Sequence, residues 1–290
     1  MEASDLLKKV RRIEIKTRGL SQNIFAGEYH TAFKGRGMTF SEVREYQYGD
    51  DVRSIDWNVT ARFQRPYVKI FEEERELTMM LLVDVSGSRD FGTQFQTKKD
   101  MMTELAATLA FSSMQNNDKI GVVFFSDRIE KFIPPQKGRK HVLHIIRELI
   151  DFEPVSRKTD IANVLRYFTN VIKKHCTAFL ISDFMDENYG DALMIANRKH
   201  DIAALHLYDI RETELPDVGL IKLKDAETEE RVWFDTSDKR LRKAYRDAWG
   251  ERMLGMQQLF AHAGVDYVSI STADDYVRGL MQLFRMRSAS

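Results

Sequence analysis

The sequence contains very little cysteine: Cys176 is the only one among 290 residues. A single cysteine cannot form an internal disulfide, which excludes the class of small disulfide-stabilised secreted scaffolds and favours a reducing compartment. The residues that follow Cys176 are mostly apolar, and this favours a packed thiol over a nucleophilic one.

Long apolar runs are also missing. The runs "MMLLV" and "AFLI" have the length of a strand, whereas a membrane-spanning helix needs about 20 apolar residues. The N-terminal residues lack the apolar stretch of a secretory signal. We therefore expect a soluble, cytoplasmic protein without a transmembrane segment.

Neither sign of charge is in excess. The 44 Lys and Arg residues are balanced by 44 Asp and Glu residues, and nucleic-acid binding normally needs a basic surplus, so we expect no nucleic-acid partner. Residues 1–18 are a local exception, because they predict a helix with Leu6, Val10 and Ile13 on one face and basic residues on the others. This helix either packs on its own domain or contacts an anionic membrane surface.

Residues 19–76 have a different character from the rest of the chain. Glycines and alternating patterns such as "YVKIF" predict short strands and turns. The charged residues in this part favour a structural network of ion pairs over a binding surface. The members expected around Trp57 are Arg44, Arg53, Asp56 and Arg62.

From Leu77 onward, buried strands alternate with amphipathic helices, which predicts an α/β fold with a doubly wound, mostly parallel sheet. The chain contains no Pro/Gly-rich linker, so we expect a β-rich addition (residues 1–76) packed on an α/β domain (residues 77–290). Residues 219–236 predict a hairpin at the edge of that domain. The expected strands are 77–83, 119–125, 129–133, 177–182, 201–208 and 265–271, and the expected helices are 97–115, 141–150, 158–174, 238–263 and 274–286.

Oxygen-bearing side chains follow two of the predicted strands. Asp84, Ser86 and Ser88 come directly after the first strand, and Asp183 comes directly after strand 177–182. Thr159 lies just before a helix whose start belongs at the same edge of the sheet, because parallel crossovers are right-handed. Ligands of open parallel sheets bind at this carboxyl edge.

Hydroxyl and carboxylate oxygens are hard donors, and no Cys or His pair lies near them in the sequence. This donor set favours Mg²⁺, with Mn²⁺ as a substitute, over zinc or copper. Neutral hydroxyl ligands leave the ion under-neutralised and with an open position. An acidic side chain of another protein can fill that position, which predicts binding rather than catalysis.

The stretch "DVSGS" (residues 84–88) resembles the Asp-x-Ser-x-Ser signature of the metal-ion-dependent adhesion site in the von Willebrand factor A (VWA) fold. Thr159 and Asp183 match the residues that complete this site. The resemblance implies that Ser86, Ser88 and Thr159 bind the ion directly, and that Asp84 and Asp183 act through bound water. It also implies a six-stranded, mostly parallel sheet with one antiparallel edge strand, for which "IEKFI" is the candidate.

The stretches "GRGMTFSEVREYQYGDDVRSIDWNVTAR", "VKIFEEERE" and "PPQKGRKHVL" and the "DAETEE" hairpin are similar to one bacterial family of unknown function with a VWA-like half. That family is usually encoded beside a MoxR-type AAA ATPase. The resemblance implies an adaptor that presents a client protein, through a client Glu or Asp, for remodelling, complex assembly or cofactor insertion. Two departures are Arg89, where many such sites carry Met, and the absence of Gly after Asp183.

One enzyme alternative remains at this point. Asp84 could serve as the nucleophile of a Mg²⁺-dependent phosphatase, because such sites also place an Asp after a buried strand. They normally carry a second Asp two residues later as acid/base, where this chain has Ser86. The sequence contains no phosphate-binding loop, so any ATP dependence would come from a partner. We therefore expect a protein that is not an enzyme.

Overall fold

The computed structural model describes residues 11, 13, 14, 37–74, 77–92, 96–227 and 229–288. Contacts divide the chain into two compact units, one of residues Phe33–Leu77 and one of residues Met1–Ala32 with Thr78–Ser290. The basic helix predicted over residues 1–18 lies largely outside the described residues, and the boundary expected after residue 76 stays a prediction. In the described part of the chain, no helix has the length and apolar character needed to cross a membrane.

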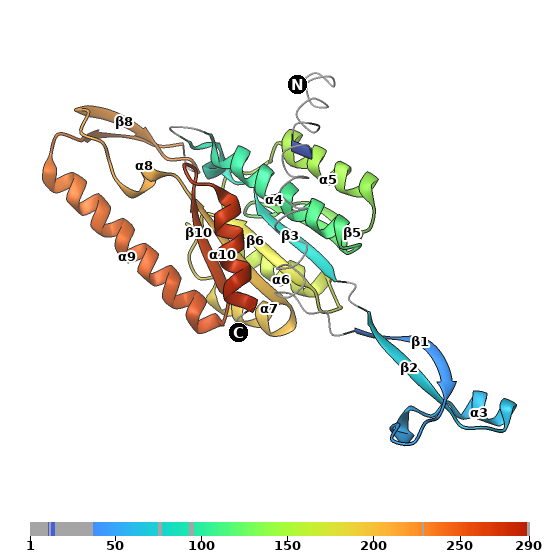
Figure 1. The fold of residues 1–290 in the computed structure, drawn as a ribbon. Coiled ribbons are helices and arrows are strands. Elements are labelled where there is room, and N and C mark those ends of the chain that lie inside the picture. The colour runs from blue at the N-terminus through green and yellow to red at the C-terminus, as the bar shows by residue number, and fades with distance from the viewer. Residues whose placement is uncertain are drawn as a thin grey trace. The chain divides into compact units, whose positions relative to one another are not determined.

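The centre of the larger unit is a six-stranded sheet with the order β10-β7-β6-β3-β4-β5 (Figure 1). All neighbouring strands are parallel except β5, which runs antiparallel to β4 at one edge. This confirms the predicted fold class and the antiparallel role of "IEKFI". The strands are β3 (Thr78–Asp84), β4 (Lys119–Phe125), β5 (Ile129–Gln136), β6 (Thr177–Ser182), β7 (Asp201–Tyr208) and β10 (Asp266–Ser271).

The inner strands are buried on both faces because helices cover the sheet on both sides. Side chains alternate along each strand. Met80 and Leu82 of β3 therefore join one core cluster, together with Phe168 of α6 and Phe260 of α9. This is why β3, β4 and β6 are nearly continuous apolar runs.

Two groups of helices can be traced from their contacts. Helix α4 (Lys98–Gln115) packs on α5 (Arg139–Asp151) and on α10 (Tyr276–Ser288). Helix α6 (Ile161–Val171) packs on α7 (Gly190–Lys199), and α7 packs on α9 (Lys239–Ala263) (Figure 1). Helix α7 was not predicted, because only Ala192, Leu193 and Ala196 of its ten residues are buried.

Between β7 and α9 the chain forms a short helix and a hairpin. Helix α8 (Ile210–Thr213) follows β7 directly. Strands β8 (Leu220–Lys224) and β9 (Arg231–Asp235) then pair antiparallel as a two-stranded sheet of their own. The hairpin predicted from the sequence is therefore present, but it does not extend the central sheet.

The smaller unit consists of strands β1 (Gly37–Glu45) and β2 (Tyr67–Glu74), which pair antiparallel. Between them lie a 3-10 turn, η2 (Val52–Ser54), and helix α3 (Trp57–Phe63), which the sequence did not predict. The pairing of its charges differs from the prediction. Arg44 binds both carboxylate oxygens of Asp50, at 2.8 and 2.7 Å. Asp56 caps α3, and Trp57 is exposed rather than enclosed by a network.

The single cysteine is buried and free, as predicted for a packed thiol. Its Sγ lies 3.4 Å from Nδ1 of His200. Burial, with a smaller effect from the nearby charge of Asp201, raises the pKa of Cys176 to about 12. The thiolate is the nucleophilic form of cysteine, so this thiol is chemically inert near neutral pH.

Gly121 lies where β4 approaches β5 most closely. A Cβ at this position would meet the carbonyl oxygen of Ile133, the nitrogen of Pro135 and the sulfur of Met80, each at 2.8 Å. Two of these atoms belong to the backbone and cannot move away easily. We expect Gly121→Ala to lower the free energy of unfolding by about 1–3 kcal/mol, as for other overpacked sites.

Urea denaturation checks this prediction, with Gly250→Ala as the matched control. Gly250 lies inside α9, and a Cβ there would meet nothing within 4 Å. The control variant should gain about 0.5–1 kcal/mol from the higher helix propensity of alanine. Equal stability of the two variants would contradict the close approach at Gly121.

Candidate functional site

The register of the parallel strands brings Asp84 and Asp183 to the same edge of the sheet. Val83 of β3 pairs with Ile181 of β6, so both strands end at the same level. Asp84 is the last residue of β3, and Asp183 follows the last residue of β6. Both carboxylates are 1% exposed. The two predicted aspartates are therefore neighbours below the surface.

The loop after β3 presents its hydroxyls above these carboxylates. The backbone N–H of Ser86 donates to Oδ1 of Asp84 at 2.9 Å, and Ser182 Oγ donates to Oδ2 of Asp84 at 2.6 Å. The Oγ atoms of Ser86 and Ser88 lie 3.1 Å apart. The Ser88 hydroxyl also lies near Asp183 and helps to lower the pKa of that carboxyl. Four of the five predicted site residues thus lie together.

Thr159, the fifth predicted residue, lies on the neighbouring loop. The N–H of Gly87 donates to the carbonyl of Arg157 at 2.9 Å, which joins this loop to the Ser86–Ser88 loop. The N–H of Ile161 donates to Asp186 at 2.7 Å, which joins it to the loop after β6. The Thr159 hydroxyl donates to Oε1 of Glu227 at 2.9 Å. Its nearest partner is therefore a carboxylate of the β8–β9 hairpin.

A lysine that the sequence analysis did not identify lies beside Asp183. The ammonium group of Lys98 is fully buried and donates to Oδ2 of Asp183 at 2.8 Å and to Oε1 of Glu212 at 2.7 Å. Lys98 is the first residue of α4, and Glu212 belongs to α8. The lysine supplies one positive charge between the carboxylates of Asp183 and Glu212, and Asp84 lies next to Asp183.

Burial and the neighbouring charges shift the pKa values of these carboxylates in opposite directions. Burial, together with the charge of Asp183, raises the pKa of Asp84 to about 7. Burial also opposes ionisation of Asp183, but the charge and hydrogen bond of Lys98 outweigh it and lower the pKa of Asp183. Burial raises the pKa of Glu212 despite its bond to Lys98. The pair of aspartates thus shares a deficit of positive charge, which a bound cation would relieve.

Arg89, the departure noted in the sequence, does not supply this charge by contact. Its side chain is buried, and Nη2 donates to the carbonyl of Phe152 at 2.9 Å. It also approaches Glu153 at 3.7 Å. Arg89 therefore fastens the loop of residues 152–160, which carries Thr159, to the end of β3.

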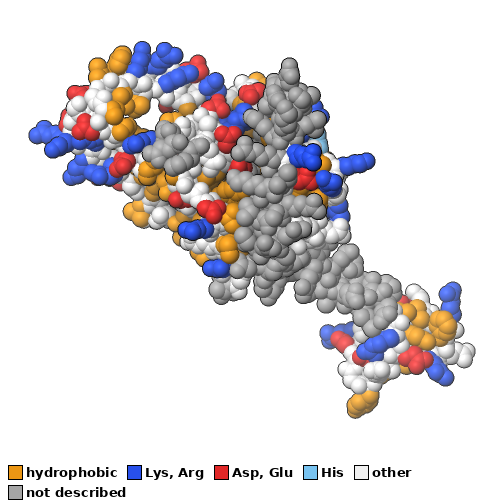
Figure 2. All heavy atoms as spheres, turned by 45° about the horizontal axis from the view of Figure 1, so that its top comes forward, with side chains coloured by type: hydrophobic (Ala, Val, Ile, Leu, Met, Phe, Trp, Pro, Cys, Tyr) orange, Lys and Arg blue, Asp and Glu red, His pale blue; other side chains and the backbone are white. Residues whose placement is uncertain are grey.

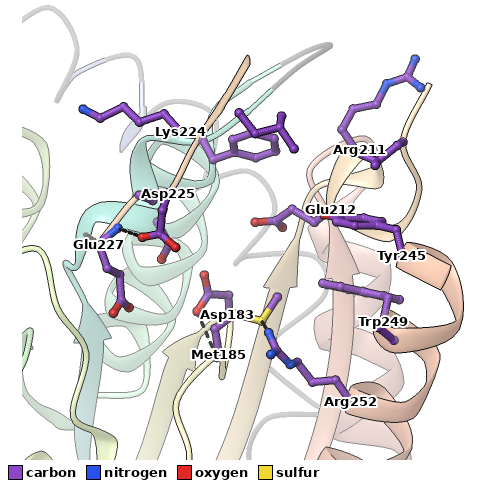
Figure 3. A pocket seen from close by; sticks show the side chains of 16 residues that line it. Asp183, Met185, Arg211, Glu212, Lys224, Asp225, Glu227, Tyr245, Trp249 and Arg252 are labelled. Carbon is purple, nitrogen blue, oxygen red and sulfur yellow. Dashed lines mark hydrogen bonds between the residues drawn. The ribbon is translucent and has the colours of Figure 1, made fainter. Parts of the chain in front are cut away.

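A cavity of about 600 Å³ opens above the site. Ser88 and Asp183 are among the residues that line it. Residues of the hairpin form one wall, and α9 forms the opposite wall (Figure 3). Tyr245 and Trp249 project into the cavity from α9, and Arg252 follows one turn further along (Figure 3). Ser88 and Asp183 of the predicted site are thus reachable through an opening of mixed aromatic and charged character.

The donor set fits a small divalent cation of the Mg²⁺ type. Adjacent ligands of an octahedral Mg²⁺ ion lie about 3.0 Å apart, given Mg–O distances of about 2.1 Å. The separation of the Ser86 and Ser88 hydroxyl oxygens, 3.1 Å, is close to this value. Within the described residues, no group of three or more His, Cys, Asp or Glu side chains is placed to hold a metal ion. A cation here would therefore depend on the hydroxyls.

Three residues of the site were missed at the level of sequence: Lys98, Glu212 and Glu227. Lys98 had a usable signal, because Lys98, Met102, Leu105 and Leu109 fall on one face of the predicted helix. A lysine on the apolar face of a helix needs a buried partner. Glu212 and Glu227 carry no comparable signal, since only the tertiary fold brings α8 and the hairpin to the strand ends.

A family model described as a protein of unknown function, DUF58, matches residues 42–253. The chain belongs to this family. Among its relatives, the uncharacterized protein Rv1480 of Mycobacterium tuberculosis is 28% identical over 285 residues, which cover 97% of this chain and 90% of Rv1480. The uncharacterized protein YeaD of Bacillus subtilis is 28% identical over 109 residues, which cover 38% of this chain and 25% of YeaD.

Solved structures similar to this DUF58 chain include BatB from Bacteroides thetaiotaomicron. That likeness has a TM-score of 0.49 at 13% identity and covers 74% of this chain and 100% of BatB. The VWA domain of SpRpn10 has a TM-score of 0.40 at 12% identity and covers 73% of this chain and 94% of that domain. At these scores the likenesses support no conclusion about the site.

We expect Lys98→Met to lower the free energy of unfolding by about 3–5 kcal/mol, because the variant leaves buried carboxylates without their counter-charge. Lys99→Met is the matched control, since Lys99 forms a partly exposed ion pair with Glu153 at 3.3 Å. The control should change stability by no more than about 1 kcal/mol. Urea denaturation measures the stability of both variants. A Lys98→Met protein as stable as the control would refute the role of Lys98 as the counter-charge of the buried carboxylates.

Proposed function

We propose that this DUF58 protein is a divalent-cation-dependent protein-binding module and not an enzyme. Ser86, Ser88 and Thr159 would hold Mg²⁺, or Mn²⁺ as a substitute, and Asp84 and Asp183 would orient its waters. When bound, the cation offers an open coordination position to an acidic side chain of a partner protein. The observation that carries this proposal is the pair of serine hydroxyls 3.1 Å apart, over two buried carboxylates and below an open cavity.

The surroundings of the cavity support an acidic partner. The first two turns of α9 carry Lys239, Arg240, Arg242 and Lys243. Lys and Arg side chains are frequent on the outer end of the α/β unit that carries the hairpin and the start of α9 (Figure 2). Such a basic stretch, on the helix that also forms one cavity wall, would attract and orient an acidic surface before close contact is made.

The phosphatase alternative fits the geometry less well. A nucleophilic carboxylate must reach its substrate, but Asp84 is 1% exposed and both of its oxygens accept hydrogen bonds. The position two residues later carries a serine, which cannot act as an acid/base near neutral pH. These two observations favour binding over phosphoryl transfer.

The proposed partner is an AAA ATPase together with its client protein. The family resemblance suggests a MoxR-type ATPase, to which this chain would present a client that offers a Glu or Asp. The smaller unit, residues Phe33–Leu77, would then be the second docking surface. The association with the ATPase, the cytoplasmic location and any membrane contact through residues 1–18 stay predictions.

Isothermal titration calorimetry with Mg²⁺ and Mn²⁺ tests the metal site. We expect Ser86→Ala with Ser88→Ala to weaken cation binding by at least about 10- to 100-fold, the range seen when groups that support a metal site are removed. Ser237→Ala, an exposed serine in the turn before α9, is the control and should bind as the unchanged protein does. Equal binding by the double variant would place the cation elsewhere.

Partner capture separates the two functions. The binding proposal expects proteins to be retained from native lysate in Mg²⁺ and lost both in EDTA and with Asp84→Ala, without any Mg²⁺-dependent release of phosphate from an aryl phosphate. The phosphatase alternative expects phosphate release that Asp84→Asn abolishes. An identical captured set under all conditions would contradict the binding proposal.

A further inference from the structure

The tip of the β8–β9 hairpin lies directly on the Ser86–Ser88 loop. An added Cβ on Gly87 would lie 2.2 Å from the carbonyl oxygen of Ala226 and 3.2 Å from Cβ of Arg157. Only glycine leaves room for this approach, so the loop after β3, the loop carrying Thr159 and the hairpin tip all meet at Gly87.

The same tip directs a carboxylate into the candidate site. The N–H of Glu227 donates to Oδ1 of Asp225 at 2.9 Å, which fixes the turn. Oε1 of Glu227 accepts the hydroxyl hydrogen of Thr159 at 2.9 Å. The Glu227 side chain extends from the hairpin wall toward the level of Asp183 (Figure 3). A carboxylate of this chain is therefore already in contact with one of the predicted cation ligands.

The hairpin is attached in a way that permits release. Glu229 pairs with Lys224 at 2.8 Å and with Arg157 at 3.4 Å, and Glu229 is itself about half exposed. Exposed ion pairs of this kind contribute little to stability. The two strands pair only with each other, and an isolated two-stranded hairpin is marginally stable. The tip can thus leave the site without disturbing the central sheet.

We propose that Glu227 is an internal carboxylate ligand that caps the cation site, and that a partner's acidic side chain must displace the hairpin tip to bind. This inference rests on the proposed function. It identifies the resting occupant of the position that a partner would take. The protein then binds its partner only by exchanging one carboxylate for another, which makes the hairpin the element that regulates access.

Hydrogen–deuterium exchange of the full chain, with and without Mg²⁺, tests this proposal. In the unchanged protein, Mg²⁺ should slow exchange of the amides between residues 220 and 235 by about tenfold or more, because the cation ties Glu227 to the site. Glu227→Gln keeps the size and hydrogen-bonding oxygen of the side chain but removes its charge, and it should abolish this slowing. Glu229→Gln loses the two ion pairs but keeps Glu227, so it should retain the slowing.

A second measurement uses N-acetylglutamate amide as the carboxylate probe on the Mg²⁺-loaded protein. Its binding should be at least about fivefold tighter to Glu227→Gln than to the unchanged protein or to Glu229→Gln. Equal probe binding by all three proteins, or slowing that persists in Glu227→Gln, would overturn the proposal. If calorimetry shows no Mg²⁺ binding to the unchanged protein, the proposed function itself fails. If Mg²⁺ binds through Ser86 and Ser88 but Glu227→Gln behaves as unchanged protein, only the internal ligand is wrong.

Discussion

Two buried carboxylates, those of Asp84 and Asp183, lie together at the end of adjacent parallel strands, and the surrounding structure compensates their repulsion. Ser182 and the N–H of Ser86 hydrogen-bond Asp84, while Lys98 neutralises Asp183. Without these partners, two neighbouring charges in a poorly hydrated position would oppose folding. Helix α4 contributes to this compensation because it brings Lys98 to the strand ends, where the lysine binds Asp183 and also Glu212 of α8.

The compensation is incomplete, and the proposed cation binding depends on this incompleteness. One ammonium group binds Asp183 and Glu212, while Asp84 beside them is held by hydrogen bonds from Ser182 and Ser86, so this end of the sheet has more carboxylates than ammonium groups beneath two serine hydroxyls. A structural ion-pair network would be expected to balance its charges more closely. A divalent cation would offset this excess, and its open coordination position would make a further carboxylate a favourable neighbour. The same local charge therefore explains why a cation would bind first and an acidic group of a partner would bind after it.

Much of the fold could be predicted because buried parallel strands are apolar runs that end abruptly in polar residues. The transition from Val83 to Asp84 and from Ser182 to Asp183 marked both the strands and the site. The features that could not be predicted are those whose local sequence is typical of a more common structure. Lys98 sits in a pair of lysines that looks like a solvated helix start, and α7 buries too few residues to show a clear period. The docking of Glu227 on Thr159 depends on where a hairpin folds back, which no local pattern encodes.

The distribution of tryptophan has a practical consequence. The chain has three, and the structure places one in each of three functionally separate parts. Trp57 is 67% exposed in the smaller unit, Trp233 is 59% exposed on the hairpin beneath the ammonium group of Lys222, and Trp249 lines the cavity wall. Replacing any two by phenylalanine would leave a single tryptophan. The tryptophan emission of this protein can therefore be resolved into separate optical signals from the smaller unit, the hairpin and the cavity, without attaching a dye.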